Sequence, residues 1–149
     1  MGEVIAIANQ KGGVGKTTTA VNLSASLGVY EKSVLLVDVD PQANASSGLG
    51  IRVEEESGTI YEVLTGEAEL KDVVKKTELV KLVPSHPKLT GAEIELVSQM
   101  ARERKMKNAL AGIRDDYDFV ILDCPPSLGL LTLNTLTAAD SILIPIQCE

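Results

Sequence analysis

The sequence is poor in aromatic residues and in cysteine: it has no tryptophan, one phenylalanine, three tyrosines and two cysteines among 149 residues. Cys124 and Cys148 fit neither a metal-binding spacing nor a disulfide framework, and we interpret both as small apolar core residues. No apolar run is long enough to cross a bilayer. The N-terminal residues reach a polar segment by Asn9, so the core of a signal peptide is absent. We expect a cytoplasmic protein.

Basic residues are fewer than acidic ones, so the net charge is −7. Contacts to nucleic-acid phosphates need clustered lysine and arginine, so this balance argues against strong DNA binding by this segment alone. The densest basic stretch is Arg102–Lys107. We interpret it as a solvated helix face, with a DNA or partner patch as the alternative. The apolar content of 44% and the length indicate one globular domain over residues 1–149.

Apolar runs alternate with helical patterns along the chain. The predicted strands are Val4–Ala8, Ser33–Val39, Leu79–Val83, Phe119–Leu122 and Ser141–Ile146. The predicted helices are Lys16–Tyr30, Thr59–Leu64, Glu69–Lys75, Ala92–Arg114 (whole or broken) and Leu130–Ala139, with a loop or short helix in Asp40–Gly58. This order predicts an α/β fold, in which a parallel sheet is covered by helices on both faces.

The last predicted strand ends three residues before the end of the sequence. An apolar strand at the edge of a sheet invites aggregation, although Pro145 reduces that hazard because it cannot donate to a neighbouring strand. We therefore expect either a C-terminally truncated segment of a longer protein or another element that covers this edge.

A glycine-rich segment, Gln10–Thr17, lies between the first strand and the first helix, which is the context that a phosphate-binding loop requires. Backbone amides can wrap around an anion only where bulky side chains are absent, and the helix N-terminus adds partial positive charge. Lys16 is placed to reach the β- and γ-phosphates, and the Thr17 hydroxyl to ligate magnesium. The predicted nucleotide-binding residues are Gly12, Gly13, Val14, Gly15, Lys16, Thr17 and Thr18.

Two predicted strands run into acidic residues at their carboxyl ends, where ligands bind in parallel sheets. Asp123 follows four apolar residues and is expected to hold magnesium through a coordinated water; a helix cap is the alternative. Asp38 and Asp40 lie on one side of the second strand if it extends that far. Two close carboxylates require a cation or donors nearby. The alternative for Asp40 is a cap of the loop at Pro41.

The loop departs from the common phosphate-loop pattern, because Gln10 replaces its first glycine and Lys11 adds a second lysine. In this it resembles the variant loop of the ParA/MinD group of P-loop ATPases. Further stretches are similar to the ParA/Soj chromosome- and plasmid-partitioning branch, namely Leu35–Gln42, Asn44–Gly50, Tyr117–Asn134 and Ile144–Glu149. The resemblance covers the whole chain and implies a P-loop NTPase architecture of the SIMIBI or MinD-like type.

The resemblance also implies a function: a slow Mg-ATPase that cycles between ATP and ADP and dimerises with ATP. Lys11 would act across the dimer on the partner's nucleotide, Asp40 would activate the attacking water, and Asp38 would support the metal region. The implied partners are a second copy, a ParB-like centromere-binding protein and non-specific DNA, with no membrane. In this family the segment after the last predicted strand completes the adenine pocket and carries much of the DNA-binding surface.

Two other functions stay open on the sequence. One is a nucleotide-dependent protein that positions cargo other than DNA. The other is a truncated, non-catalytic module that forms mixed dimers with a full-length relative. The presence of Lys11, Lys16, Asp40 and Asp123 argues against loss of the chemistry, although not against truncation.

Overall fold

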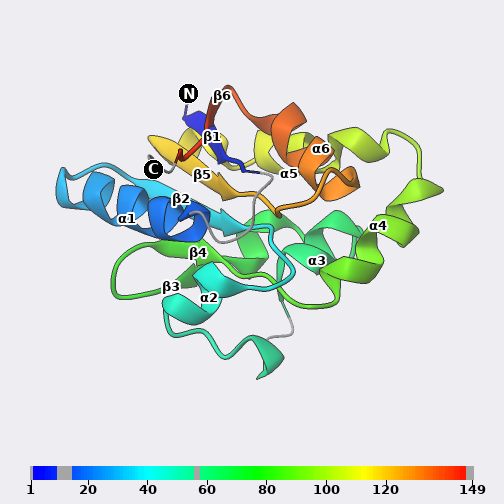
Figure 1. Ribbon diagram of the computed structural model, residues 1–149, viewed down its shortest axis with the longest axis horizontal. Coiled ribbons are helices and arrows are strands. Elements are labelled where there is room, and N and C mark those ends of the chain that lie inside the picture. The colour runs from blue at the N-terminus through cyan, green and yellow to red at the C-terminus, as the bar shows by residue number, and fades with distance from the viewer. Residues whose placement is uncertain (1, 10–14, 56–57, 147–149) are drawn as a thin grey trace.

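A mostly parallel β-sheet forms the centre of the computed structural model, which describes residues 2–9, 15–55 and 58–146 (Figure 1). The strand order is β3-β4-β2-β5-β1-β6, and β3 is antiparallel to β4 whereas the other neighbours are parallel. The strands are β1 (Glu3–Ile7), β2 (Val34–Asp38), β3 (Lys75–Lys76), β4 (Lys81–Val83), β5 (Phe119–Asp123) and β6 (Ser141–Leu143).

The described chain also contains six α-helices and four short 3₁₀ helices, which loops join to the strands. The helices are α1 (Lys16–Val29), α2 (Asn44–Gly48), α3 (Ile60–Leu64), α4 (Leu89–Val97), α5 (Lys105–Ala111) and α6 (Leu130–Ala138). The 3₁₀ helices are Val53–Glu55, Leu70–Val73, Arg102–Arg104 and Arg114–Asp116.

Helices cover both faces of the sheet because side chains alternate along each buried strand. On β2, Val34 and Leu36 pack in one apolar cluster with Ala20 of α1 and Ala45 of α2. Leu35 of the same strand packs in a second cluster on the opposite face, with residues of α3, α4, α5 and α6. The predicted α/β fold, with a parallel sheet between two helical layers, is confirmed.

The structure departs from the sequence expectations mainly at the edge beyond β4. The short helix predicted over Glu69–Lys75 is present only as the 3₁₀ helix Leu70–Val73, and Lys75 begins β3. The strand predicted over Leu79–Val83 begins only at Lys81, because the side chain and backbone of Thr77 close a turn onto Val80.

Of two further segments, the first confirms the broken alternative, and the second is shorter than predicted. The helix predicted over Ala92–Arg114 is broken, and Ala101 in the break has the left-handed φ of 53°. The strand predicted over Ser141–Ile146 ends at Leu143, before the proline that cannot donate a ladder hydrogen bond.

Helix α6 is capped from another helix. Its N-cap residue, Gly129, has no side chain, and the Oε1 atom of Glu93 in α4 accepts a hydrogen bond from the Leu131 amide at 3.1 Å. A Cβ added at Gly129 would lie 2.1 Å from this Oε1 atom. The glycine therefore leaves room for a carboxylate at the positive end of the helix dipole.

Replacing Glu93 by alanine is expected to lower the free energy of unfolding by about 1 kcal/mol, because α6 loses its cap. Gly129→Ala should have a similar effect by displacing the carboxylate, and the double variant should be little worse than either single one. Urea denaturation of the three variants measures this, with exposed Glu103→Ala as control. Additive losses from the two single changes would contradict a shared cap.

Candidate functional site

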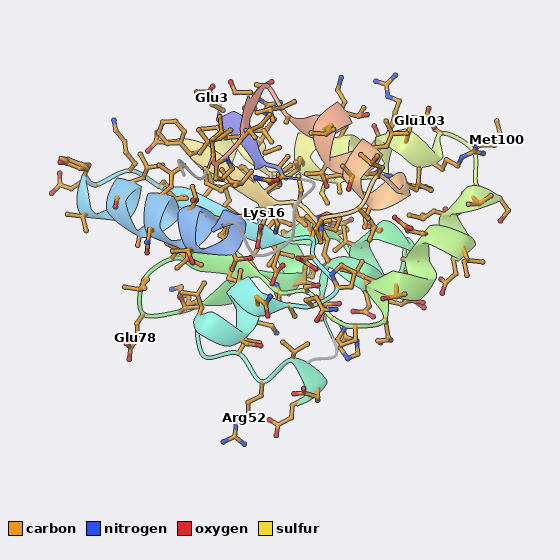
Figure 2. The ribbon with its side chains drawn as sticks, viewed as in Figure 1. Glu3, Lys16, Arg52, Glu78, Met100 and Glu103 are labelled. Atoms are coloured by element: carbon orange, nitrogen blue, oxygen red, sulfur yellow. The ribbon has the colours of Figure 1, made fainter. Side chains whose placement is uncertain are left out.

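The first turn of α1 lies at the carboxyl ends of the central strands. Its N-cap residue is Gly15, which has the left-handed φ of 79° and no side chain that could cap the helix. Figure 2 shows Lys16 near the centre of the molecule, whereas the other labelled residues, such as Arg52 and Glu78, lie at the periphery. The predicted residues Lys11, Gly12, Gly13 and Val14 lie outside the described part of the chain.

The Lys16 ammonium group joins two of the predicted acidic residues. Its Nζ atom lies 2.5 Å from Oδ1 of Asp123 and 3.5 Å from Oδ2 of Asp40, and all three side chains are buried. The Thr17 hydroxyl donates to the other oxygen of Asp123, Oδ2, at 3.0 Å. Residues from α1, from the end of β5 and from the loop after β2 thus form one charged cluster.

Asp38 is held by backbone and hydroxyl donors. It is the register partner of Asp123 on the neighbouring strand β5, and both residues are fully buried. Its Oδ2 atom accepts from the Ser46 amide at 2.9 Å and the Ser46 hydroxyl at 2.7 Å, and its Oδ1 atom accepts from the Asp40 amide at 3.2 Å. Burial, with the nearby Asp123 carboxylate, raises the pKa of Asp38 to about 7.

Asp123 has opposing influences on its ionisation. Burial raises its pKa, while the Lys16 ammonium and the Thr17 hydroxyl act in the other direction. The net effect is a raised pKa, because desolvation is the largest of these causes. Its neighbour Cys124 is a fully buried apolar residue, as predicted, and burial raises the pKa of its thiol to about 12. Cys148 lies outside the described residues.

A pocket of about 320 Å³ opens beside this cluster. It is lined by Gly15, Lys16, Thr17, Thr18, Asp40, Gln42, Asn44 and Pro126. The pocket thus contains the N-terminus of α1, which favours anions, together with a buried ammonium group and a hydroxyl group. These are the groups that a phosphate chain requires.

The charges of the cluster also favour a divalent cation. Asp38, Asp40 and Asp123 are buried carboxylates, and Lys16 is the buried ammonium group in contact with two of them. Within the described ranges, no three His, Cys, Asp or Glu side chains are grouped to hold a metal by themselves. Magnesium commonly takes one or two protein groups together with phosphate oxygens and waters, so this donor set fits a metal that arrives with a nucleotide.

Comparison with known proteins gives the family. The sequence model of the AAA domain matches residues 2–149. Chromosome partitioning protein ParA of Myxococcus xanthus is 57% identical over 151 residues, which cover 100% of this chain and 53% of that protein. Sporulation initiation inhibitor protein Soj of Bacillus subtilis is 54% identical, with coverage of 100% and 60%. The chain belongs to the AAA-domain family.

Solved structures share the fold of this chain. A crystal structure of cobyrinic acid a,c-diamide synthase from Mycobacterium smegmatis, with bound ATP analogue and magnesium, has a TM-score of 0.98 and 45% identity. The match covers 100% of this chain and 62% of that one. Compared with the ParA and Soj relatives named above, this chain spans little more than half of their length.

The structure brings together five of the predicted site residues: Gly15, Lys16 and Thr17 at the start of α1, with Asp40 and Asp123 beside them. Thr18 lines the same pocket. Asp38 lies behind them, with both oxygens bonded to Ser46 and Asp40, so its role at a metal stays a prediction.

Sequence reasoning missed three residues that line the pocket, namely Gln42, Asn44 and Pro126. Their positions were the available signal: Gln42 lies in the loop after β2, Asn44 begins α2, and Pro126 follows Asp123 by three residues. It also missed Ser46, which lies in the stretch Asn44–Gly50, and Ser85, which no motif marks. In the described residues, no helix is long and apolar enough to cross a membrane.

Proposed function

We propose that this chain is the nucleotide-binding part of an ATP-dependent dimerisation switch, which hydrolyses Mg-ATP slowly and serves chromosome or plasmid partitioning. The observation that carries this proposal is the position of the Lys16 ammonium, between Asp123 and Asp40 at the N-terminus of α1. The bound ATP analogue and magnesium in the M. smegmatis relative support the choice of ligand.

Each residue of the cluster has a separate task in this proposal. Gly15 and the first-turn amides of α1 hold phosphate oxygens, and Lys16 binds the β- and γ-phosphates. The Thr17 hydroxyl would ligate magnesium, and Asp123, which accepts a hydrogen bond from that hydroxyl at 3.0 Å, would hold a water of the metal. Magnesium, when bound there, offsets the negative charge of the phosphates.

Asp40 is the proposed catalytic carboxylate. Its Oδ1 atom accepts a hydrogen bond from the Gln42 amide at 3.0 Å, and its Oδ2 atom lies 3.5 Å from the Lys16 ammonium. Both contacts hold the carboxylate at the wall of the pocket. From there it accepts a hydrogen bond from the attacking water and orients it. Phosphoryl transfer depends mainly on positioning and charge, so one such contact has a large effect.

The proposed partners follow from the family. They are a second copy of the chain, a ParB-like centromere-binding protein and, in the full-length protein, non-specific DNA in the cytoplasm. Lys11, outside the described residues, is proposed to reach the nucleotide of the second copy. The family names of the ParA and Soj relatives support partitioning as the process.

We expect the full-length protein to retard random-sequence DNA in an electrophoretic shift with Mg-ATP, and not with Mg-ADP or with ATP and chelator. Higher salt should weaken the shift, because phosphate contacts release counterions. Size-exclusion chromatography under the same three conditions should show a dimer only with Mg-ATP. A dimer without a DNA shift would indicate cargo other than DNA. A monomer under all conditions would contradict the switch.

A further inference from the structure

Two buried serines join the proposed catalytic loop to the sheet. The Ser46 hydroxyl in α2 donates to Asp38 at 2.7 Å and accepts from the Ser85 amide at 3.0 Å. The Ser85 hydroxyl, after β4, donates to the backbone carbonyl of Asp40 at 2.6 Å. The Asp40 amide donates to Oδ1 of Asp38 at 3.2 Å. Asp38, Ser46, Ser85 and Asp40 are thus joined in a closed ring of hydrogen bonds. We name Ser46 and Ser85 the serine bridge.

Among the residues that the structure describes, the serine bridge does not line the nucleotide pocket. Asp38, Ser46 and Ser85 are fully buried, and the pocket is lined instead by Asp40, Gln42 and other residues. Ser46 and Ser85 are 39 residues apart in the sequence and come from different elements. Their hydroxyls therefore act on the loop through its backbone and through Asp38.

The loop that the bridge holds contains a residue in an unfavourable conformation. Ala43 has φ of 56° and ψ of 34°, which is the left-handed region that alanine rarely adopts. Its amide donates to the Asp40 carbonyl at 2.8 Å, the same oxygen that accepts from Ser85. Such a conformation persists only where the surroundings fix it. The bridge is one of the contacts that fix it.

We propose that the serine bridge is a positioning device for the Asp40 carboxylate. This inference rests on the proposed function, in which Asp40 orients the attacking water. Ser85 fixes the Asp40 carbonyl, and Ser46 fixes Asp38, which in turn holds the Asp40 amide. Both backbone groups of Asp40 are thereby anchored, so its side chain meets the pocket in one orientation. The end of β4 thus contributes to hydrolysis without touching the nucleotide.

The test is Ser85→Ala in the full-length protein. We expect kcat for ATP hydrolysis to fall by about tenfold, with KM changed less than about twofold, because the bridge orients Asp40 and not Lys16 or Thr17. Ser46→Ala, which breaks the other half of the bridge, should give the same pattern. Amide hydrogen exchange over residues 40–44 should become several-fold faster in both variants, without nucleotide, because a fixing contact is lost.

Ser24→Ala is the matched control, because Ser24 is also fully buried and, among the residues that the structure describes, its hydroxyl bonds only within α1, to the Ala20 carbonyl. It should leave kcat and the exchange of residues 40–44 unchanged, and thermal melting shows whether each variant is folded. Wild-type kcat and unchanged exchange in Ser85→Ala would overturn the proposal. A wild-type protein without ATPase activity would instead contradict the proposed function, and the exchange experiment would still test the bridge.

Discussion

Replacing Asp40 by alanine is expected to reduce ATP hydrolysis by at least about a hundredfold, while ATP affinity stays within a few-fold of wild type. The carboxylate lies at the wall of the pocket, held by the Gln42 amide and next to the Lys16 ammonium. Lys16 and the first turn of α1 stay in place in the variant, so the groups proposed to bind phosphate are retained. Phosphate release and equilibrium binding of a fluorescent ATP analogue measure the two effects.

Asp40→Asn separates charge from loop geometry. The amide oxygen of asparagine still accepts from the Gln42 amide, whereas the negative charge that would orient water is lost. We therefore expect the asparagine variant to be about as inactive as the alanine variant. Asp72→Ala, which removes an exposed aspartate on a 3₁₀ turn, is the control and should retain full turnover. Turnover of the Asp40 variants near the wild-type rate would remove this residue from the mechanism.

Lys16→Ala is expected to weaken ATP binding by at least about a hundredfold, because the pocket loses the ammonium group proposed to bind the β- and γ-phosphates. It should also lower the free energy of unfolding by about 3 kcal/mol near neutral pH, since Asp123 is fully buried and loses its cation. Isothermal titration calorimetry and urea denaturation measure the two effects.

The loss of stability in Lys16→Ala should depend on pH. Burial already raises the pKa of Asp123 above its ordinary value, and removing the ammonium raises it further. The folded variant then binds a proton more readily than the unfolded chain. Its deficit is therefore largest above the folded pKa and shrinks as the pH falls towards the ordinary value.

The double variant Lys16→Ala, Asp123→Asn separates stability from binding. Removing the uncompensated charge should restore most of the lost free energy of unfolding, whereas ATP binding should stay weak. Lys32→Ala, which removes an exposed lysine beyond the far end of α1, should change neither property. ATP affinity at the wild-type level in Lys16→Ala would contradict the assignment of the phosphate site.

Much of this architecture is predictable because its signals are local. Buried parallel strands such as β2 read as continuous apolar runs, and Lys16 and Asp123 occupy positions that a phosphate site demands at the ends of strands. The antiparallel strand β3 was not predictable, since two lysines carry no apolar alternation. Its existence depends on the turn that Thr77 closes onto Val80.

The serine bridge shows a second limit of sequence reasoning. Ser46 and Ser85 are common polar residues without a characteristic spacing, and each would be expected in a loop or at a helix end. They meet only because β4 lies beside β2 in the sheet. The two serines are 39 positions apart in the sequence, and their contact depends on the order of the strands in the sheet. Local sequence patterns do not give that order, so they do not predict the contact. The same holds for Glu93 and Leu131, which lie on different helices.

The two edges of the sheet differ in chemical character. At one edge β3 offers the side chains of Lys75 and Lys76, and charged edge strands discourage the addition of another strand. At the other, β6 carries Ile142 and Leu143 with 52% and 41% of their surface exposed. We therefore expect this chain, expressed by itself, to self-associate through the β6 edge and not through the β3 edge. Covering β6 with a fused segment, or placing a charged residue on it, should reduce aggregation at high protein concentration.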